Sequence, residues 1–211
     1  MSALVKSELV KSKLGLQQAK SLRAREAICA ATIESLAEIG YSETSLNRVA
    51  AIAGFSKGAL QHHFPNKEDL IAATVDELLA RTFRPHSITR QPKDVQRSLL
   101  AVWTRFMNTP AYRALLEVLN AARTDKNLQN RLSGELIAWQ KKIDEQTLEN
   151  YDAVSGDPEE AKMLLNMNRS FMRGLLIQER YGVSQEQTTS YVDKWIELIS
   201  PLLKLKTVES N

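Results

Sequence analysis

Basic and polar side chains gather in one short stretch, residues 56–63, which reads SKGALQHH. Lys57 and Gln61 lie four residues apart, as do Gly58 and His62, so in a helix with the intervening leucine directed inward both pairs point outward. None of these four residues is acidic. Lysine and histidine can bind phosphate, glutamine can pair with an adenine edge, and glycine lets a backbone come close. The pattern therefore favours nucleic-acid binding.

The segments around this stretch are patterned as two helices joined by a turn. Residues 46–53 have helical apolar spacing and stop at Gly54, which suits the left-handed conformation that ends many helices. Ser56 can cap the first free amide groups of the next helix. Two helices joined by a turn of about three residues with a glycine predict a helix-turn-helix, whose second helix enters the DNA major groove.

The pattern extends on both sides and resembles the DNA-binding domain of the TetR family of bacterial transcriptional regulators. The resemblance covers about residues 23–72. Its positions outside the motif are Arg25, Glu26, Ala27, Ile28, Ala31, Leu36, Gly40, Tyr41, Thr44, Phe64, Asn66, Lys67 and Leu70. The resemblance implies C-terminal helices that dimerise and a pocket in the larger domain whose ligand releases DNA.

The resemblance also implies roles for individual residues. Thr44 would cap the second helix and touch a phosphate, and Lys67 would meet another phosphate. His63 would contact a phosphate or a base from the end of the recognition helix. Together with the motif itself, the predicted DNA contacts are Thr44, Ser56, Lys57, Gly58, Gln61, His62, His63 and Lys67.

One position departs from the family pattern. Gln61 stands where the family usually has tyrosine. Glutamine is a good partner for adenine N6 and N7, whereas tyrosine mostly contacts phosphate or a thymine methyl group. Either the base preference or the affinity should therefore differ from that of a typical member.

Composition excludes several other classes of protein. The 211 residues are 43% hydrophobic and 25% charged, which is ordinary for a globular protein. No apolar run reaches the ~20 residues of a membrane span, and no secretory signal is present, so we expect a cytoplasmic protein without a membrane partner. The single Cys29 excludes an intramolecular disulfide and fits a small buried apolar residue.

No enzyme chemistry is evident in the sequence. There is no phosphate loop, no nucleophile with a base at a meaningful spacing and no metal-ligand cluster, so neither a cofactor nor a metal is predicted. His62 and His63 could form a metal pair, but adjacent helical positions face about 100° apart, which favours DNA contacts instead.

Positive charge is concentrated at the start of the chain. The formal net charge is +3, yet residues 1–25 carry six basic residues and one acid. This arm could lie along phosphates or in the minor groove. It could equally be a solvated leader.

Apolar residues elsewhere recur at intervals of three and four, and no pattern predicts a strand. We therefore predict an all-α protein of about nine helices, with an N-terminal three-helix helix-turn-helix domain and a C-terminal helical domain for ligand binding and dimerisation. The polar segment 84–93, bracketed by prolines, is the clearest boundary. The predicted divisions are a basic, flexible arm at 1–20, the DNA-binding domain at 21–68, a connector helix at 69–84 and the C-terminal domain at 94–205.

Capping residues mark helix boundaries in the C-terminal half. A threonine before Pro110 and an aspartate before Pro158 are caps followed by proline at the first helical position. Gly182 should end one helix, and Ser184 and Gln187 have capping-box spacing for the next. The connection is short, so these last two helices should lie antiparallel and adjacent.

Two sets of residues in the C-terminal half have candidate functions. Large apolar residues at helical spacing could line a ligand pocket or simply fill the core: Trp103, Met107, Trp139, Met163, Met167 and Phe171. The final helix is apolar on more than half its girth, so it must be covered on two sides. The predicted dimer interface comprises Phe171, Tyr191, Trp195, Ile199 and Leu202.

These patterns favour a sequence-specific transcriptional regulator. We predict a dimeric repressor that binds a palindromic double-stranded DNA operator and is released by a small-molecule effector. The alternative is a helical DNA-binding protein with little sequence preference or without an effector. A binder without sequence preference would need a larger basic surplus than +3.

Overall fold

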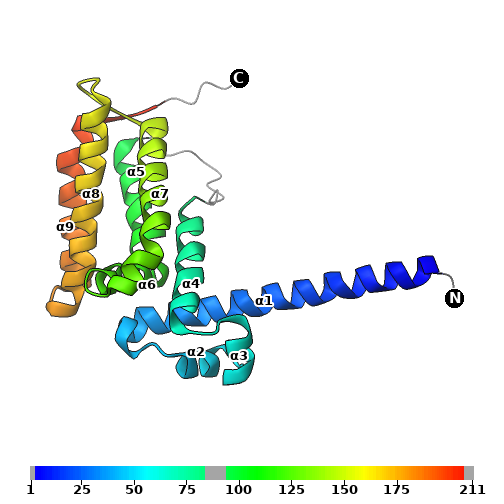
Figure 1. Ribbon diagram of the computed structural model, residues 1–211. Helices are drawn as coiled ribbons and strands as arrows, with labels where there is room; N and C mark the ends of the chain where they lie inside the picture. Colours follow the sequence, from blue (N-terminus) through cyan, green and yellow to red (C-terminus); the bar gives the residue numbers. More distant parts are fainter. Residues whose placement is uncertain (1–2, 84–93, 207–211) are drawn as a thin grey trace.

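The computed structural model describes residues 3–83 and 94–206, with side chains from Gln17 onward. Within these residues the chain forms nine α-helices and one two-stranded sheet, with a small N-terminal unit joined to a taller helical bundle (Figure 1). The helices are α1 (Ala3–Glu43), α2 (Leu46–Ala53), α3 (Lys57–His63), α4 (Lys67–Thr82), α5 (Val95–Val102), α6 (Pro110–Ala122), α7 (Lys126–Asn150), α8 (Pro158–Gln178) and α9 (Gln185–Ile199). The predicted all-α class is confirmed. The predicted linker 84–93, with His86, lies outside the described residues.

The first helix is longer than predicted. We expected it to begin at Ser21 after a flexible arm, but α1 begins at Ala3 and its first half projects away from the other helices (Figure 1). The helix therefore begins earlier than predicted, and the flexibility of residues 1–20 stays a prediction. The segment holds four leucines, four lysines and no proline, which favours a helix, and Gly15 disfavours it by about 1 kcal/mol.

A glycine breaks α1 close to its C-terminal end. Gly40 has φ 81° and ψ 178°, a conformation that side chains with a Cβ rarely adopt. A Cβ atom at this position would lie 2.9 Å from Oε2 of Glu117 on α6. The glycine therefore serves both the turn and the close approach of α1 to α6.

Two apolar cores hold the helices together. The smaller core joins α1, α2, α3 and the start of α4 through Ile28, Cys29, Ala31, Val49, Ala50, Leu60, Phe64 and Leu70. The larger core joins the rest of α4 to the bundle of α5–α9, and it also contains Ile33 and Leu36 of α1. Both α1 and α4 therefore belong to both cores.

The predicted caps of the C-terminal helices are confirmed. Thr109 accepts a hydrogen bond from the Tyr112 amide at the start of α6, and Asp157 accepts one from the Glu159 amide at the start of α8. Ser184 forms the predicted capping box at the start of α9. Gly182, with φ 94°, ends a short 3-10 turn, Glu179–Tyr181, that continues α8.

Two features of the bundle were not predicted. The helix that begins with α5 passes into a single π turn, Trp103–Met107, instead of continuing as a regular α-helix. Two short strands, β1 (Tyr151–Ala153) and β2 (Leu203–Leu205), pair antiparallel and tie the segment after α9 to the end of α7. Three-residue strands are too short to leave an alternating pattern in a sequence.

The last helix presents one apolar stripe to the core and another to solvent. Val192, Ile196 and Ile199 are buried against the bundle. Tyr191, Leu198 and Leu202 are exposed. Among residues 3–83 and 94–206, no helix combines the length and apolar character needed to cross a membrane.

Candidate DNA-binding and ligand-binding sites

The turn between α2 and α3 is fixed by local hydrogen bonds. Gly54 adopts φ 72° and ψ 25°, and the Phe55 amide donates back to the Ala50 carbonyl at 2.9 Å. Ser56 then caps α3, because its Oγ accepts a hydrogen bond from the Ala59 amide at 3.2 Å. These bonds set the direction in which α3 leaves the turn.

One face of α3 is held in the core and the other is free. Leu60 and Phe64 are buried in the smaller core. The two outward pairs, Lys57 with Gln61 and Gly58 with His62, are exposed. Nothing lies within 4 Å of a Cβ built at Gly58. This arrangement leaves open the surface that the sequence assigned to DNA. The DNA contacts themselves stay a prediction.

Thr44 was predicted to cap the second helix and touch a phosphate, but its side chain is buried. Its side chain is 1% exposed, and its hydroxyl donates to the Gly40 carbonyl at 2.8 Å and pairs with the Ser35 hydroxyl at 3.0 Å. The cap of α2 is instead Ser45, whose Oγ accepts a hydrogen bond from the Arg48 amide at 3.3 Å. The predicted capping role of Thr44 is therefore wrong, and its buried, hydrogen-bonded hydroxyl does not support the predicted phosphate contact.

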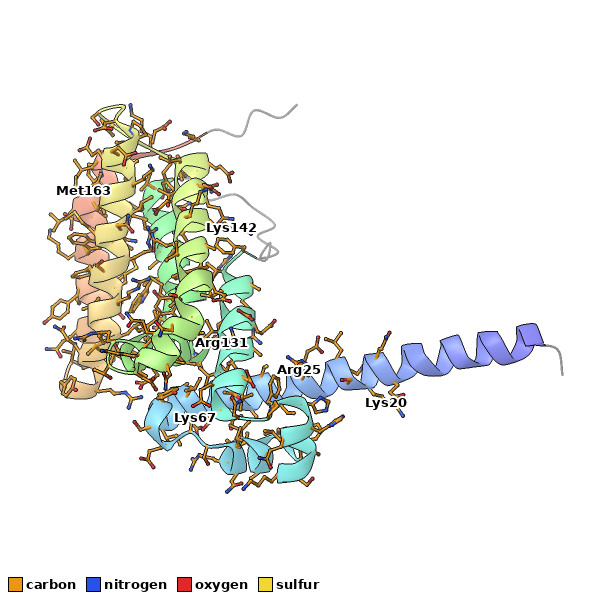
Figure 2. All side chains as sticks on the ribbon, in the orientation of Figure 1. Lys20, Arg25, Lys67, Arg131, Lys142 and Met163 are labelled. Atoms are coloured by element: carbon orange, nitrogen blue, oxygen red, sulfur yellow. The ribbon has the colours of Figure 1, made fainter. Side chains whose placement is uncertain are left out.

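Lys67 is also engaged within the protein. Its Nζ donates to the Tyr41 carbonyl at 2.6 Å and lies 4.1 Å from the centre of the Tyr41 ring. Burial lowers the pKa of Lys67 below its ordinary value, although Glu68 and other carboxylates oppose this shift. Figure 2 shows Lys67 beside α1. The structure thus supports a role in joining α4 to α1 more directly than a phosphate contact.

Replacing Lys67 with alanine should lower the melting temperature and leave the salt dependence of DNA binding nearly unchanged. A part-buried hydrogen bond and a cation–π contact together contribute about 1–2 kcal/mol, which corresponds to a shift of a few degrees. Calorimetry and binding titrations at several salt concentrations would measure both effects. Lys57→Ala is the matched comparison. Its melting temperature should be nearly unchanged, and the salt dependence of its DNA binding should be reduced. A salt slope reduced by about one in Lys67→Ala would restore the phosphate role.

Arg25 supports the end of α3 and was noted in the sequence only as part of the family pattern. Its guanidinium donates to the His63 carbonyl at 3.1 Å and lies 4.3 Å above the Phe64 ring. Burial, and then the nearby His62 and Arg25, lower the pKa of His63 below its ordinary value. His63 is therefore mainly neutral near pH 7 and suits a hydrogen bond better than an ion pair.

Comparison with known proteins agrees with this geometry. Residues 28–74, which contain α2, α3 and the turn between them, match the family described as bacterial regulatory proteins, tetR family. This N-terminal part of the chain is therefore a TetR-type DNA-binding domain. The TetR-type match ends within α4.

Similarity to individual transcriptional regulators extends further along the chain. The regulator BetI of Paraburkholderia phymatum is 28% identical over 198 residues, which cover 79% of this chain and 97% of that protein. An uncharacterised HTH-type transcriptional regulator of Mycobacterium tuberculosis is 33% identical over 119 residues, and the match spans 54% of this chain and 60% of that relative's length. A transcriptional regulator from Saccharomonospora viridis, solved in complex with choline, has a TM-score of 0.63 at 17% identity over 88% of this chain and 99% of that chain. This likeness shows a shared fold.

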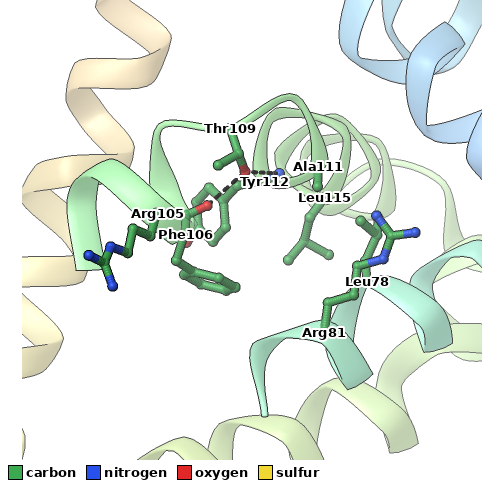
Figure 3. Close-up of a pocket in the computed structure, with 8 residues that line it drawn as sticks. All are labelled: Leu78, Arg81, Arg105, Phe106, Thr109, Ala111, Tyr112 and Leu115. Atoms are coloured by element: carbon green, nitrogen blue, oxygen red, sulfur yellow. Dashed lines mark hydrogen bonds between the residues drawn. The ribbon is translucent and has the colours of Figure 1, made fainter. Parts of the chain in front are cut away.

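A pocket of about 240 Å³ opens between α4, the π turn and α6. Its lining consists of Leu78, Arg81, Arg105, Phe106, Thr109, Ala111, Tyr112 and Leu115 (Figure 3). None of the six residues predicted to line a pocket belongs to it. The position of this pocket depends on how α6 crosses α4, which residue type alone does not reveal.

The predicted pocket residues lie in other places. Trp103, Met107 and Trp139 are buried in the larger core, and the Trp139 indole nitrogen donates to the Thr82 hydroxyl at 3.3 Å. Met163 and Met167 are 55% and 48% exposed on α8. The prediction that these residues line the pocket is therefore corrected: the first three fill the core and the two methionines face solvent.

The predicted dimer residues divide between the core and an exposed face. Phe171 and Trp195 stack at 4.7 Å between α8 and α9 and are half-buried. Ile199 is only 3% exposed and packs inside its own chain, so its assignment to the interface is wrong. The outer face, which we call the α8/α9 face, exposes Met163, Met167, Ile177, Tyr181, Tyr191, Leu198 and Leu202.

Proposed function

We propose that this protein is a dimeric, sequence-specific transcriptional repressor that a small molecule releases from a palindromic operator. The observation that carries the proposal is the exposed lysine, glycine, glutamine and histidine face of α3, presented by a helix whose other side is anchored by Leu60 and Phe64. A short helix held in this way can enter a major groove without reordering. Because the matching family is described as bacterial, and bacterial chromosomal DNA lies in the cytoplasm, we infer that the protein acts there.

Dimerisation is proposed from the α8/α9 face. One short recognition helix reads few bases, whereas a two-fold pair reads two half-sites about 34 Å apart. The α8/α9 face offers a run of large apolar side chains on two adjacent helices. The same pair of helices from a second chain would bury it in a four-helix interface.

Release by a ligand is proposed from the position of the pocket. The pocket is lined by α4 and α6, and both helices also reach the DNA-binding part: α4 enters the smaller core, and α6 approaches α1 at Gly40. The structural neighbour solved with choline supports a small-molecule site in this fold. A ligand that favours one arrangement of α4 by ~1–3 kcal/mol would lower operator affinity about 5–150-fold.

We further propose the functional division of the chain that the sequence suggested. The DNA-binding unit ends near residue 68, α4 serves as the connector, and the bundle from residue 94 to 205 carries ligand binding and dimerisation. The larger core supports one refinement, because Ile33 and Leu36 of α1 pack with the bundle. The connecting function is therefore shared by α1 and α4.

A binding selection tests the proposal against a DNA binder without preference. Purified protein would be mixed with fragments of the genome that encodes it and with excess random DNA, and retained fragments would be sequenced. We expect a small set of fragments that share an inverted repeat. Retention proportional to fragment length alone would instead support the alternative of a binder with little sequence preference.

Replacing Gln61 with alanine should relax the base preference at one position in each half-site. A lost bidentate contact costs about 1–3 kcal/mol of discrimination against the wrong base. The measurement is operator binding across all single-base variants. Gln129→Ala, an exposed glutamine on α7, is the matched control and should change nothing. An unaltered preference in Gln61→Ala would refute base readout by this side chain.

A further inference from the structure

The pocket between α4 and α6 carries charge of one sign. Leu78, Phe106 and Leu115 give it apolar walls. Arg81 lies on one side and Arg105 on the other, and the exposed side chain of Arg105 is directed outward, away from the other lining residues (Figure 3). None of its lining residues is a carboxylate. An apolar cavity whose charged lining residues are all positive favours an organic anion over a cation.

The two arginines are not equivalent. Arg81 is paired, because its Nε donates to Oε1 of Glu77 at 3.0 Å. Arg105 is exposed and forms no ion pair or side-chain hydrogen bond with any residue in the described part of the chain. The Arg105 guanidinium is therefore available to form two parallel hydrogen bonds with a carboxylate.

The π turn brings Arg105 and Phe106 to the pocket. Trp103 and Met107 anchor its two ends in the core, and the Asn108 amide donates to the Trp103 carbonyl at 2.8 Å. The π turn ends the helix that begins with α5, so Arg105 and Phe106 lie in its last turn. Single π turns within α-helices frequently occur at functional sites.

The aromatic wall of the pocket is fixed in place. Phe106 meets the Tyr112 ring edge-on at a centroid distance of 5.2 Å. The Tyr112 hydroxyl accepts a hydrogen bond from Nε of Arg173 at 2.7 Å. Thr109 donates to the Phe106 carbonyl at 2.8 Å and so joins the π turn to the start of α6. A flat ligand ring would therefore meet a wall that needs little ordering.

We propose that this pocket binds a one-ring aromatic carboxylate. The ring would lie among Phe106, Leu78 and Leu115, and the exposed side chain of Arg105 would turn toward the rim and pair with the carboxylate. A volume of about 240 Å³ equals roughly eight water molecules at ~30 Å³ each, which suits one ring with a short acid chain. The proposal names the effector class of the site on which the proposed function depends, but binding in the pocket can be measured without DNA.

Isothermal titration of the full chain with three probes of similar shape tests the charge preference. Phenylacetate is the anion, phenylacetamide its neutral isostere and benzyltrimethylammonium the cation. We expect phenylacetate to bind at least about tenfold more tightly than the amide, because it alone forms a charge-assisted pair with Arg105. The cation should not bind. Equal affinity for anion and amide, or binding of none of the three by folded protein at millimolar concentration, would overturn the proposal.

Three variants locate the binding site. Arg105→Gln should weaken phenylacetate binding about tenfold and leave the amide unchanged. Arg123→Gln, an exposed arginine at the far end of α6, should bind both probes as the parent does. Ala111→Phe fills the pocket and should abolish binding of both probes, with circular dichroism confirming that it is folded. Full phenylacetate affinity in either Arg105→Gln or Ala111→Phe would place the ligand elsewhere and overturn the proposal.

Measuring operator binding with the same protein samples distinguishes the pocket assignment from the proposed repressor function. Loss of operator binding on addition of phenylacetate would support both. Protein that binds phenylacetate through Arg105 but selects no DNA would contradict the repressor function and leave the pocket assignment intact. Protein that selects an operator but does not bind phenylacetate would contradict the pocket assignment alone.

Discussion

Leu198→Glu is expected to convert the proposed dimer into monomers at micromolar concentration. Leu198 is 59% exposed at the centre of the outer stripe of α9, so the glutamate is solvated in the monomer and the chain should fold normally. In a two-fold interface the substitution appears twice, and each carboxylate would be buried without a partner. At several kcal/mol per uncompensated charge, the dimer dissociation constant should rise at least about 100-fold.

Sedimentation velocity over a range of concentrations would measure this effect. Ile137→Glu is the matched control, because Ile137 is also an exposed apolar residue but lies on α7 outside the α8/α9 face. Ile199 is unsuitable for the test, since it is buried and its replacement would disturb the fold itself. A Leu198→Glu dimer that persists at micromolar concentration would show that the interface lies elsewhere.

Lys57→Glu is expected to lose nearly all operator binding without losing stability. Lys57 is exposed in the first turn of α3, so its replacement disturbs no packing. The loss of a phosphate contact, with repulsion added, costs about 1–3 kcal/mol in each half-site, or roughly 2–6 kcal/mol for the dimer. Operator affinity should therefore fall by at least about 30-fold, and the salt slope should decrease by about one for each lost contact.

Fluorescence anisotropy with a labelled operator at several salt concentrations would test this prediction. Lys126→Glu makes the same charge change at the exposed start of α7 and controls for net charge. We expect the control to show only a small, uniform loss that disappears at higher salt. Equal losses in the two variants would indicate that overall charge, rather than the α3 face, governs DNA binding.

The sequence predicted the local features of the DNA-binding site well. The Gly54 turn, the Ser56 cap and the outward direction of Lys57 and Gln61 follow from helix periodicity and from capping preferences, which act within a few residues. Thr44 shows the limit of this approach. Thr44 and Ser45 are adjacent hydroxyl residues, and only the packing of α1 decides which one is buried and which one caps α2.

The C-terminal features depended on contacts between distant segments and were harder to predict. The two apolar stripes of α9 were evident in the sequence, but which stripe faces inward depends on where α8 and α5 lie, so Ile199 was misassigned. Large apolar residues can fill a core or line a pocket, and Trp103 and Met107 fill the core. The residues that line the pocket include Arg105, which the π turn positions.

The sharing of Ile33 and Leu36 between α1 and the bundle has a consequence for chimeric regulators. A fusion joined at residues 84–93 would separate these side chains from the apolar residues that cover them. It would also lose the hydrogen bond from Arg180 to the Ala37 carbonyl and the fit of Glu117 beside Gly40. Exchanging the DNA-binding unit of this protein for that of a relative should therefore succeed only if the matching surface of α6 is transplanted with it.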